Sequence, residues 1–230
     1  MKKKLVVLSG SGISAESGID TFRSTNGLWN QYDIKQVATP EAWAKSPDLV
    51  TEFYNQRRKS VLEAHPNEAH RKIAALENTY DVVVITQNID DLHERGESQN
   101  VLHLHGNIRM AKSSGPKAEN NYYPIKGWEL KASDRCPDGY RLRPHVVWFG
   151  EPVPMIETAT KVVSAAEIFI VVGTSLQVYP AAGLLDHVSK NCRCYVIDPA
   201  TEELTLPQGF VAIKKNAVAG MNALFKELTS

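Results

Sequence analysis

Short runs of β-branched and aliphatic residues alternate along the chain with segments in which apolar residues recur at helical spacing. The runs predict strands over residues 5–9, 82–86, 101–104, 146–149, 168–172, 195–198 and 211–213. Several runs are apolar without alternation, which is typical of strands covered on both faces. Strands that alternate with helices indicate an α/β fold with a largely parallel, doubly wound sheet.

Two of the predicted helices can be placed by their first residues. Asn216 is a suitable N-cap, and apolar residues recur at helical spacing from Val218 to Leu228. Another helix is expected to begin near Pro66, a residue favoured in the first turn, with Ile73 and Leu76 on one side.

Two stretches interrupt the alternation of strands and helices. Residues 22–78 contain no convincing strand and are expected to form a loop followed by helices, and residues 107–142 are irregular and rich in Gly, Pro, Ser and Asn. We therefore predict one domain over residues 1–230 with two parts. The larger part covers about residues 1–30, 79–106 and 144–230, and a small module covers about residues 31–78 and 107–143.

The composition is that of an ordinary soluble domain. Of the 230 residues, 43% are hydrophobic, and 26 basic residues balance 26 acidic ones, so no global charge favours nucleic acid or an anionic membrane. The apolar run at residues 5–8 is too short for a secretory signal, and no run approaches membrane-spanning length. Three cysteines do not make a disulfide framework, so a cytoplasmic location is expected.

The first predicted strand leads directly into a glycine-rich turn of the form G-x-G-x-x-A, with Gly10, Gly12 and Ala15. Glycine permits a tight turn and close approach of a pyrophosphate, and a helix N-terminus supplies free N–H groups. The motif favours nucleotide binding over a purely structural strand-to-helix turn. A polar loop at residues 20–29 stands where a dehydrogenase would have its next strand, so hydride transfer is disfavoured, and this loop is suited to close over a cofactor.

Residues 10–19, followed by Phe22 and Arg23, resemble the opening motif of the sirtuins. Four further blocks arrive in the order of that family: TQNID at residues 86–90, HLHGN at 103–107, RPHVVWFGE at 143–151 and GTS at 173–175. The resemblance covers nearly the whole chain. It implies a Rossmann-like large part, a small module, NAD bound between them, and removal of acyl groups from lysine side chains of proteins or peptides.

The resemblance also implies roles for individual residues. It assigns catalysis to His105, Asn88 and Asp90. The residues that it assigns to NAD are Gly10, Ser11, Gly12, Ile13, Ser14, Ala15, Phe22, Arg23, Trp29, Gln87, Asn88, Ile89, Asp90, Gly173, Thr174, Ser175, Asp198 and Ala217. The residues that it assigns to the acyl-lysine substrate are Ala38, Tyr54, Arg57, Val147, Trp148, Phe149 and Gly150.

His105 is expected to act as a general base. A lone histidine is usually structural, and the pair His103 and His105 on one strand face also permits metal binding, so the resemblance carries this assignment. Neutral imidazole accepts a proton at physiological pH. In the implied reaction, the acyl oxygen displaces nicotinamide from the ribose, and His105 removes a proton from a ribose hydroxyl. Water then yields free lysine and O-acyl-ADP-ribose. His103 is expected to be structural.

Two features bear on the substrate. Residues 147–150 are strand-like and end in glycine, which fits both a core strand with a turn and an edge where an extended peptide pairs. Tyr54 and Arg57, with the small Ala38, resemble the acyl pocket of class III sirtuins, and a phenol beside a guanidinium suits a carboxylate. This implies a preference for succinyl- or malonyl-lysine. The alternative places Arg57, next to Arg58, on a solvated helix face.

The chain departs from the family where most sirtuins bind zinc. That interval, residues 107–142, contains only Cys136, and four thiolates are needed for a four-cysteine site, so no zinc is expected. Packing must then hold the small module, and Tyr122, Tyr123, Trp128 and Tyr140 are candidates. Cys192 and Cys194 suit a helix-to-strand connection better than a metal site.

Three smaller departures lie near the expected cofactor site. Ser11, Asp20 and Asp198 stand where the family usually has alanine, proline and asparagine, and Asp198 ends a strand, where it can accept hydrogen bonds from ribose hydroxyls. Two alternatives use the same NAD site. One is an NAD glycohydrolase or ADP-ribosyltransferase, in which the groove and acyl pocket would be idle; the other is a silent NAD-sensing module, which the intact His105 disfavours.

Overall fold

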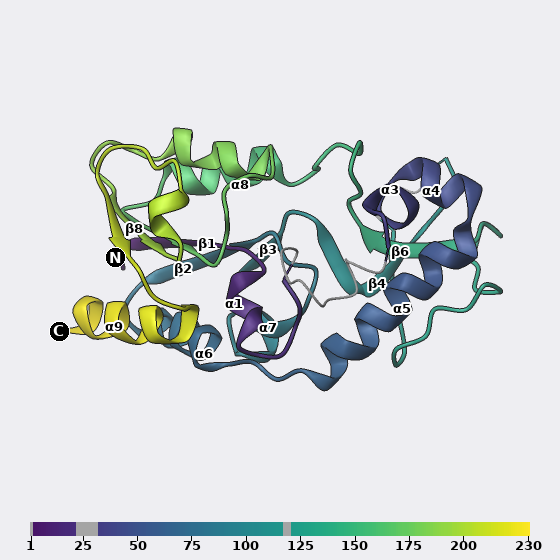
Figure 1. Ribbon diagram of the computed structural model, residues 1–230, viewed down its shortest axis with the longest axis horizontal. Coiled ribbons are helices and arrows are strands. Elements are labelled where there is room, and N and C mark those ends of the chain that lie inside the picture. The colour runs from purple at the N-terminus through teal and green to yellow at the C-terminus, as the bar shows by residue number, and fades with distance from the viewer. Residues whose placement is uncertain (1, 22–31, 117–120) are drawn as a thin grey trace.

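The computed structural model describes residues 2–21, 32–116 and 121–230 (Figure 1). A six-stranded parallel sheet has the order β3-β2-β1-β7-β8-β9. Its strands are β1 (Lys4–Ser9), β2 (Asp81–Thr86), β3 (Val101–His103), β7 (Ile168–Val172), β8 (Arg193–Ile197) and β9 (Phe210–Ile213). Because the chain winds outwards from β1 in both directions, the sheet has the doubly wound order of Rossmann-like folds, and the predicted fold class is confirmed.

Helices cover both faces of this sheet, as Figure 1 shows for α8 on one side and α6 and α9 on the other. Each face of the sheet has its own hydrophobic core. Successive residues of β1 alternate between them: Leu5 and Val7 pack on one face, and Val6 and Leu8 on the other. All four side chains are fully buried, which explains the unbroken apolar run. The elements against the first face are α1 (Gly12–Ala15), α6 (Glu68–Ala75), η1 (Leu76–Asn78) and α9 (Ala217–Thr229); those against the second are α8 (Ile156–Ser164) and η2 (Ala181–His187).

A second, three-stranded antiparallel sheet has the order β5-β4-β6. Its strands are β4 (Gly106–Ser113), β5 (Tyr122–Pro124) and β6 (Leu142–Val146), and the helices beside it are α3 (Ile34–Val37), α4 (Pro40–Lys45) and α5 (Pro47–Glu63). The short helices α7 (Leu92–Arg95) and η3 (Thr201–Glu203) belong to the parallel sheet, where α7 contacts α6 and η3 follows β8. The prediction that residues 107–142 are irregular was therefore wrong for β4 and β5, but it holds for residues 125–141, which contain only an isolated bridge between Arg135 and Arg141. The predicted strand over residues 146–149 was also wrong, because β6 ends at Val146.

Both errors have the same physical cause. Strand β4 alternates buried and partly exposed positions, so polar residues such as Arg109 and Lys112 interrupt its apolar pattern. Strand β6 contains Pro144, which is tolerated because β6 lies at the edge of the sheet. A sheet that buries only one face carries a weaker sequence signal than the central parallel strands do.

The interior of the antiparallel sheet differs from the predicted aromatic packing. Tyr122, Trp128 and Tyr140 are 44%, 39% and 46% exposed, and only Tyr123 packs against the core. The thiol of Cys136 is buried there and donates to Ser113 Oγ at 3.4 Å. The buried apolar residues beside Cys136 are Ala111, Ile125, Leu130 and Leu142.

Helix α5 is fastened to this sheet by buried polar groups. Asn55 exchanges two hydrogen bonds with the backbone of Leu130, at 3.0 and 2.9 Å. The fully buried Arg58 donates to the carbonyls of Ile108 at 2.6 Å and Trp128 at 2.8 Å. Arg58 therefore does not lie on a solvated helix face, because its guanidinium supplies donors to loop carbonyls in the interior.

The starts of two helices differ in detail from the prediction. Helix α6 is capped by Asn67, one residue after Pro66, and His70 completes a capping box. Asn216 occupies the N-cap position of α9, but its side chain makes no capping bond. Instead, Glu16 accepts a hydrogen bond from Val218 N at 2.9 Å, so the end of α1 is tied to the start of α9. Among the described residues, no helix is both long and apolar enough to cross a membrane.

The turn after β1 touches the turn after β7 through glycines. Gly10 N and Gly12 N donate to the carbonyls of Val172 and Gly173, at 3.0 and 2.8 Å. Gly173 has a φ of +63°, and a Cβ there would lie 2.4 Å from Ile13 N. The glycines are therefore required because the two backbone turns approach each other closely, whether or not a ligand also contacts them.

We expect Gly173→Ala to lower the free energy of unfolding much more than Gly139→Ala, measured by chemical denaturation. Gly139 also has a positive φ, +82°, but open space around it, so this control isolates a backbone cost of about 1–2 kcal/mol. Gly173→Ala adds overpacking of about 1–3 kcal/mol. An equal decrease in the free energy of unfolding of the two variants would show that the turns after β1 and β7 can move apart without an energetic cost.

Candidate active site

Most of the residues predicted to bind a cofactor lie beyond the carboxyl ends of the parallel strands, where open α/β sheets bind ligands. Residues 10–15 follow β1, residues 87–90 follow β2, and residues 173–175 follow β7. Asp198 follows β8, where its carboxylate accepts from Ala200 N at 2.8 Å, and the buried Ala217 begins α9. Phe22, Arg23 and Trp29 lie outside the described residues.

Asn88 joins the segment after β2 to the turn after β1. Its side-chain amide donates to Gly10 O and to Ser14 Oγ, both at 3.2 Å. Its backbone N–H donates to Thr86 Oγ1 at 3.0 Å. Asn88 is buried, so these bonds fix the direction of its amide beside the glycine turn.

Asp90 is buried in the same cluster. Ser14 Oγ donates to one carboxylate oxygen at 3.0 Å, and Leu92 N donates to the other at 3.1 Å. Burial raises the pKa of Asp90, and the two hydrogen bonds act in the opposite direction. Ser14 thus links both predicted catalytic side chains, Asn88 and Asp90.

Gln87 orients His105. The Gln87 backbone carbonyl lies 2.8 Å from His105 Nδ1, and the Gln87 side-chain amide donates to Thr174 Oγ1 at 3.0 Å. Because a carbonyl only accepts, Nδ1 carries the proton and Nε2 of the neutral ring is left as an acceptor. Burial lowers the pKa of His105, and the bond to Gln87 offsets this in part. A half-buried neutral imidazole with Nε2 available is the form that a general base needs.

Residues 147–150 lie beside this base without forming a strand. Val147 N donates to His105 O at 2.9 Å, and Phe149 N donates to Ala38 O at 3.0 Å. Trp148 N donates to Glu151 Oε2 at 2.9 Å, and Gly150 ends the segment with a φ of +91°. The amides of residues 147–149 are thus bonded within the chain, and this segment connects His105 to Ala38.

The predicted acyl-pocket residues Ala38 and Tyr54 are buried in one apolar cluster with Trp148, and Ile89 packs against it. The Trp148 indole Nε1 donates to Tyr54 Oη at 3.2 Å, and burial raises the pKa of Tyr54 to about 12. The phenol therefore stays protonated. Because its oxygen accepts from Trp148, its own O–H can serve as a donor.

Arg57 is half-buried one turn after Tyr54 on α5. Burial lowers the pKa of Arg57, and the neighbouring Tyr54 phenol and the charges of Asp90 and Asp20 act in the opposite direction. The charges of Asp90 and Asp20 thus act on Arg57. Its half-buried side chain does not lie on a fully solvated helix face.

Sequence reasoning missed the groups that support residues 147–150. The Arg143 guanidinium lies 3.6 Å over the Trp148 ring and forms an ion pair with Glu151 at 2.8 Å. Arg143 and Glu151 begin and end the RPHVVWFGE block, so their opposite charges were visible in the sequence. No helical or strand spacing pairs residues eight apart, and this contact depends on the turn between them.

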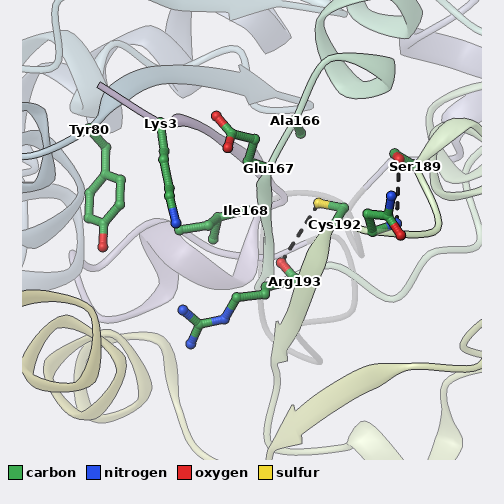
Figure 2. Close-up of a pocket in the computed structure, with 9 residues that line it drawn as sticks. Lys3, Tyr80, Ala166, Glu167, Ile168, Ser189, Cys192 and Arg193 are labelled. Carbon is green, nitrogen blue, oxygen red and sulfur yellow. Dashed lines mark hydrogen bonds between the residues drawn. The ribbon is translucent and has the colours of Figure 1, made fainter. Parts of the chain in front are cut away.

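Neither a metal-ligating cluster nor a thiol site lies beside these residues in the part of the chain that the structure describes. Within the described ranges, no group of three or more His, Cys, Asp or Glu side chains is placed to hold a metal ion. Cys192 lines a pocket at the amino ends of the parallel strands, together with Arg193 at the start of β8 (Figure 2), and Cys194 is the next residue of β8. Their thiols bond to backbone carbonyls, those of Arg193 and Cys192. The pocket is also lined by Lys3, Tyr80, Ala166, Glu167, Ile168, Ser189 and Asn191.

Comparison with known proteins gives concordant results. Residues 10–180 match the Sir2 family. NAD-dependent protein deacylases of Helicobacter pylori and Bacteroides thetaiotaomicron are 48% and 47% identical to this chain over 98% and 96% of its length, and over 95% and 96% of their own. A crystal structure of a Sir2 homolog–NAD complex has a TM-score of 0.87 and 37% identity, covering 99% of this chain and 90% of that one.

A Sir2 structure with a deacetylated peptide and 3′-O-acetyl ADP-ribose is also similar, with a TM-score of 0.78 and 29% identity over 98% of this chain and 94% of that one. These matches extend across both sheets, and the family match over residues 10–180 contains the glycine turn, residues 87–90 and His105. This chain belongs to the Sir2 family.

Proposed function

We propose that this chain is an NAD-dependent protein-lysine deacylase, which yields nicotinamide, O-acyl-ADP-ribose and free lysine. The observation that carries the proposal is the placement of His105, with Nδ1 held by Gln87, beside the Asn88–Ser14–Asp90 cluster. Relatives that are 47–48% identical over nearly the whole chain are NAD-dependent protein deacylases.

The described residues fit NAD. Gly10 and Gly12 form a glycine turn directly after β1, at the carboxyl edge of the parallel sheet, where such turns bind a pyrophosphate. Asn88, Ser14 and Asp90 present an amide, a hydroxyl and a carboxylate for the ribose and the nicotinamide amide. When bound, NAD supplies the electrophilic ribose carbon. His105 holds an acceptor nitrogen for a hydroxyl proton, and Gln87 keeps that ring in the required tautomer.

The experiment that tests this function separates it from NAD glycohydrolysis. Nicotinamide release should require an acyl-lysine peptide, and mass spectrometry should find deacylated peptide and O-acyl-ADP-ribose in equal amounts. Equal release of nicotinamide with and without peptide would favour the glycohydrolase.

We further propose that the acyl group is succinyl or malonyl. The buried phenol of Tyr54 remains a donor, Arg57 supplies a cation one turn away, and Ala38 leaves volume beside them. A carboxylate accepts from both donors, and an acetyl group has no such acceptor at its end.

We also propose that folding is zinc-independent. The buried Cys136 donates to Ser113 within an apolar core, and Asn55 and Arg58 hold the neighbouring loops. Elemental analysis of purified protein should find no stoichiometric zinc, and a chelator should leave both activity and the unfolding temperature unchanged. Bound zinc that raises the unfolding temperature would contradict this, because it would require other ligands than four cysteines.

The division of the chain into a larger part and a small module remains a prediction, as does the cytoplasmic location. The packing of α6 on the parallel sheet supports assigning residues 68–75 to the larger part, and not to the small module. Limited proteolysis and cell fractionation would test these two points.

A further inference from the structure

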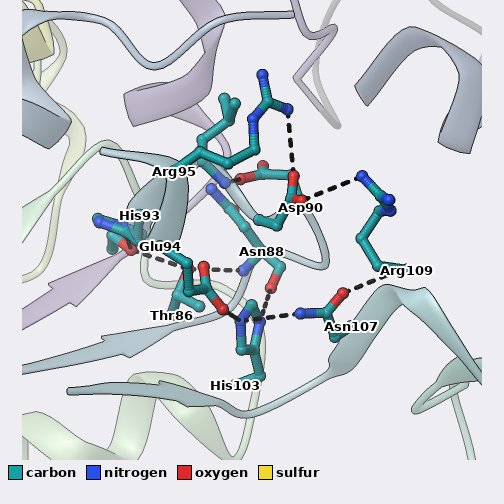
Figure 3. A network of polar contacts seen from close by, with 12 residues as sticks. Thr86, Asn88, Asp90, His93, Glu94, Arg95, His103, Asn107 and Arg109 are labelled. Atoms are coloured by element: carbon teal, nitrogen blue, oxygen red, sulfur yellow. Dashed lines mark hydrogen bonds and ion pairs between the residues drawn. The ribbon is translucent and has the colours of Figure 1, made fainter. Parts of the chain in front are cut away.

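A second histidine lies next to the predicted catalytic segment and is held differently from His105. His103 is the last residue of β3 and pairs with Thr86 in the parallel ladder. Its Nδ1 lies 3.0 Å from the Asn88 carbonyl, and its Nε2 lies 2.7 Å from Glu94 Oε1 on α7 (Figure 3). Both ring nitrogens of His103 therefore face acceptors.

This arrangement determines the charge of the ring. A neutral imidazole has one N–H and cannot donate to two acceptors, whereas the imidazolium donates to both. Asn107 Nδ2 lies 3.5 Å from Nε2, a longer contact than the one to Glu94. Burial lowers the pKa of His103, but the hydrogen bond and charge of Glu94, together with the Asn88 carbonyl and the charge of Asp90, outweigh it, and the pKa is raised above 6.5. His105, which has no carboxylate partner, shifts in the opposite direction.

We propose that the Glu94–His103 ion pair is a positioning device for the NAD site: the charged ring of His103 holds the Asn88 carbonyl, so that the Asn88 amide faces Gly10 and Ser14. This inference rests on the proposed function, because it assigns Asn88 to NAD. His103 acts through Asn88 and is a positioning residue.

The surroundings of the pair favour a cation at this place. The negative charge of Asp90 raises the pKa of His103, and the positive charge of His103 in turn lowers the pKa of Asp90. Arg95 and Arg109 are both paired with Asp91, each at 3.3 Å. The remaining titratable neighbours, His93 and His145, both have a lowered pKa, for which burial is the largest cause and the charge of His103 a smaller one.

Ring-nitrogen NMR of the full chain tests the charge without NAD or peptide. At pH 6.5, His103 should be more than half protonated in the wild type and less than half in Glu94→Gln, because burial then dominates. Glu157→Gln, an exposed carboxylate on α8, is the matched control and should leave the His103 signal unchanged. A His103 ring that is mostly neutral in the wild type would overturn the proposal.

Calorimetric titration with NAD tests the positioning. Glu94→Gln and His103→Ala should each weaken NAD binding about tenfold, as expected for loss of one charge-assisted hydrogen bond. His103→Asn keeps an amide donor near the position of Nδ1 and should recover part of the affinity. A merely structural role would lower the unfolding temperature of all three variants and leave the Kd for NAD unchanged, and that result would overturn the proposal.

The experiment still gives an answer if one variant does not fold or if the proposed function is wrong. If His103→Ala does not fold, Glu94→Gln, which keeps the size of the side chain, decides the outcome. If the wild type deacylates no acyl-lysine peptide, the proposed function fails, but the NAD titrations still support or overturn the positioning role.

Discussion

Replacing His105 with alanine is expected to lower the turnover number for deacylation by about 10²–10⁴-fold, the effect typical of a lost general base. Gln87 holds Nδ1 of this ring, and no other residue placed in the site offers a neutral imidazole with Nε2 available. The measurement is kcat with saturating NAD and acyl peptide. His65→Ala, which removes an exposed histidine, is the control and should leave kcat unchanged.

The pH dependence of the wild type follows from the same geometry. The base must be neutral, and burial lowers the pKa of His105 below 6.5. Activity should therefore be present above that lowered pKa and fall as the pH drops through it, with a midpoint below 6.5. An alanine variant that retains full kcat, or a midpoint well above 6.5, would exclude His105 as the base.

Arg57→Met should lower kcat/KM for succinyl-lysine peptide about tenfold to a hundredfold relative to acetyl-lysine peptide. A hydrogen bond between the guanidinium and a carboxylate in a partly dehydrated pocket is worth about 1.5–3 kcal/mol, and about 1.4 kcal/mol is a factor of ten. Acetyl-lysine has no terminal carboxylate to lose, and the reacting amide is the same in both peptides. The measurement is the ratio of the two kcat/KM values in the variant and the wild type.

Two other variants sharpen this comparison. Arg71→Met removes a solvent-exposed arginine from α6 and should leave the ratio unchanged. Tyr54→Phe should act in the same direction as Arg57→Met but more weakly, and it also deprives the buried Trp148 indole of its acceptor. If Arg57→Met harms both peptides equally, Arg57 is a structural residue and the acidic pocket is wrong, while the deacylase assignment stands.

The sequence predicts the parallel sheet well because its strands are buried on both faces. Strands β1 and β7 are unbroken apolar runs, and Ile168–Val172 has the predicted bounds. The glycine turn is equally visible, since Gly10 and Gly12 have no substitute where two backbones touch. Strands β4 and β6 escaped prediction because one face of their sheet carries polar residues and Pro144.

The site was predicted from motif blocks, and its supporting partners were not. Nothing in the spacing of Glu94 and His103, or of Glu16 and Val218, indicates that they meet. A side chain that bridges two elements depends on how those elements pack, and helical or strand periodicity describes only one element at a time. For the same reason the sequence identified both Tyr54 and Trp148 but not the hydrogen bond between them.

The ion pair of Arg143 and Glu151 closes residues 143–151 into a loop whose conformational entropy is already lost before a substrate arrives. Val147, Trp148 and Phe149 each have an acceptor for the backbone N–H within the chain. Ordering a flexible side chain on binding costs about 0.5–1.5 kcal/mol, and a segment fixed in advance avoids that loss. In the proposed deacylase, a segment fixed in advance can accept many peptide sequences, because no flanking side chain of the peptide is needed to order the protein.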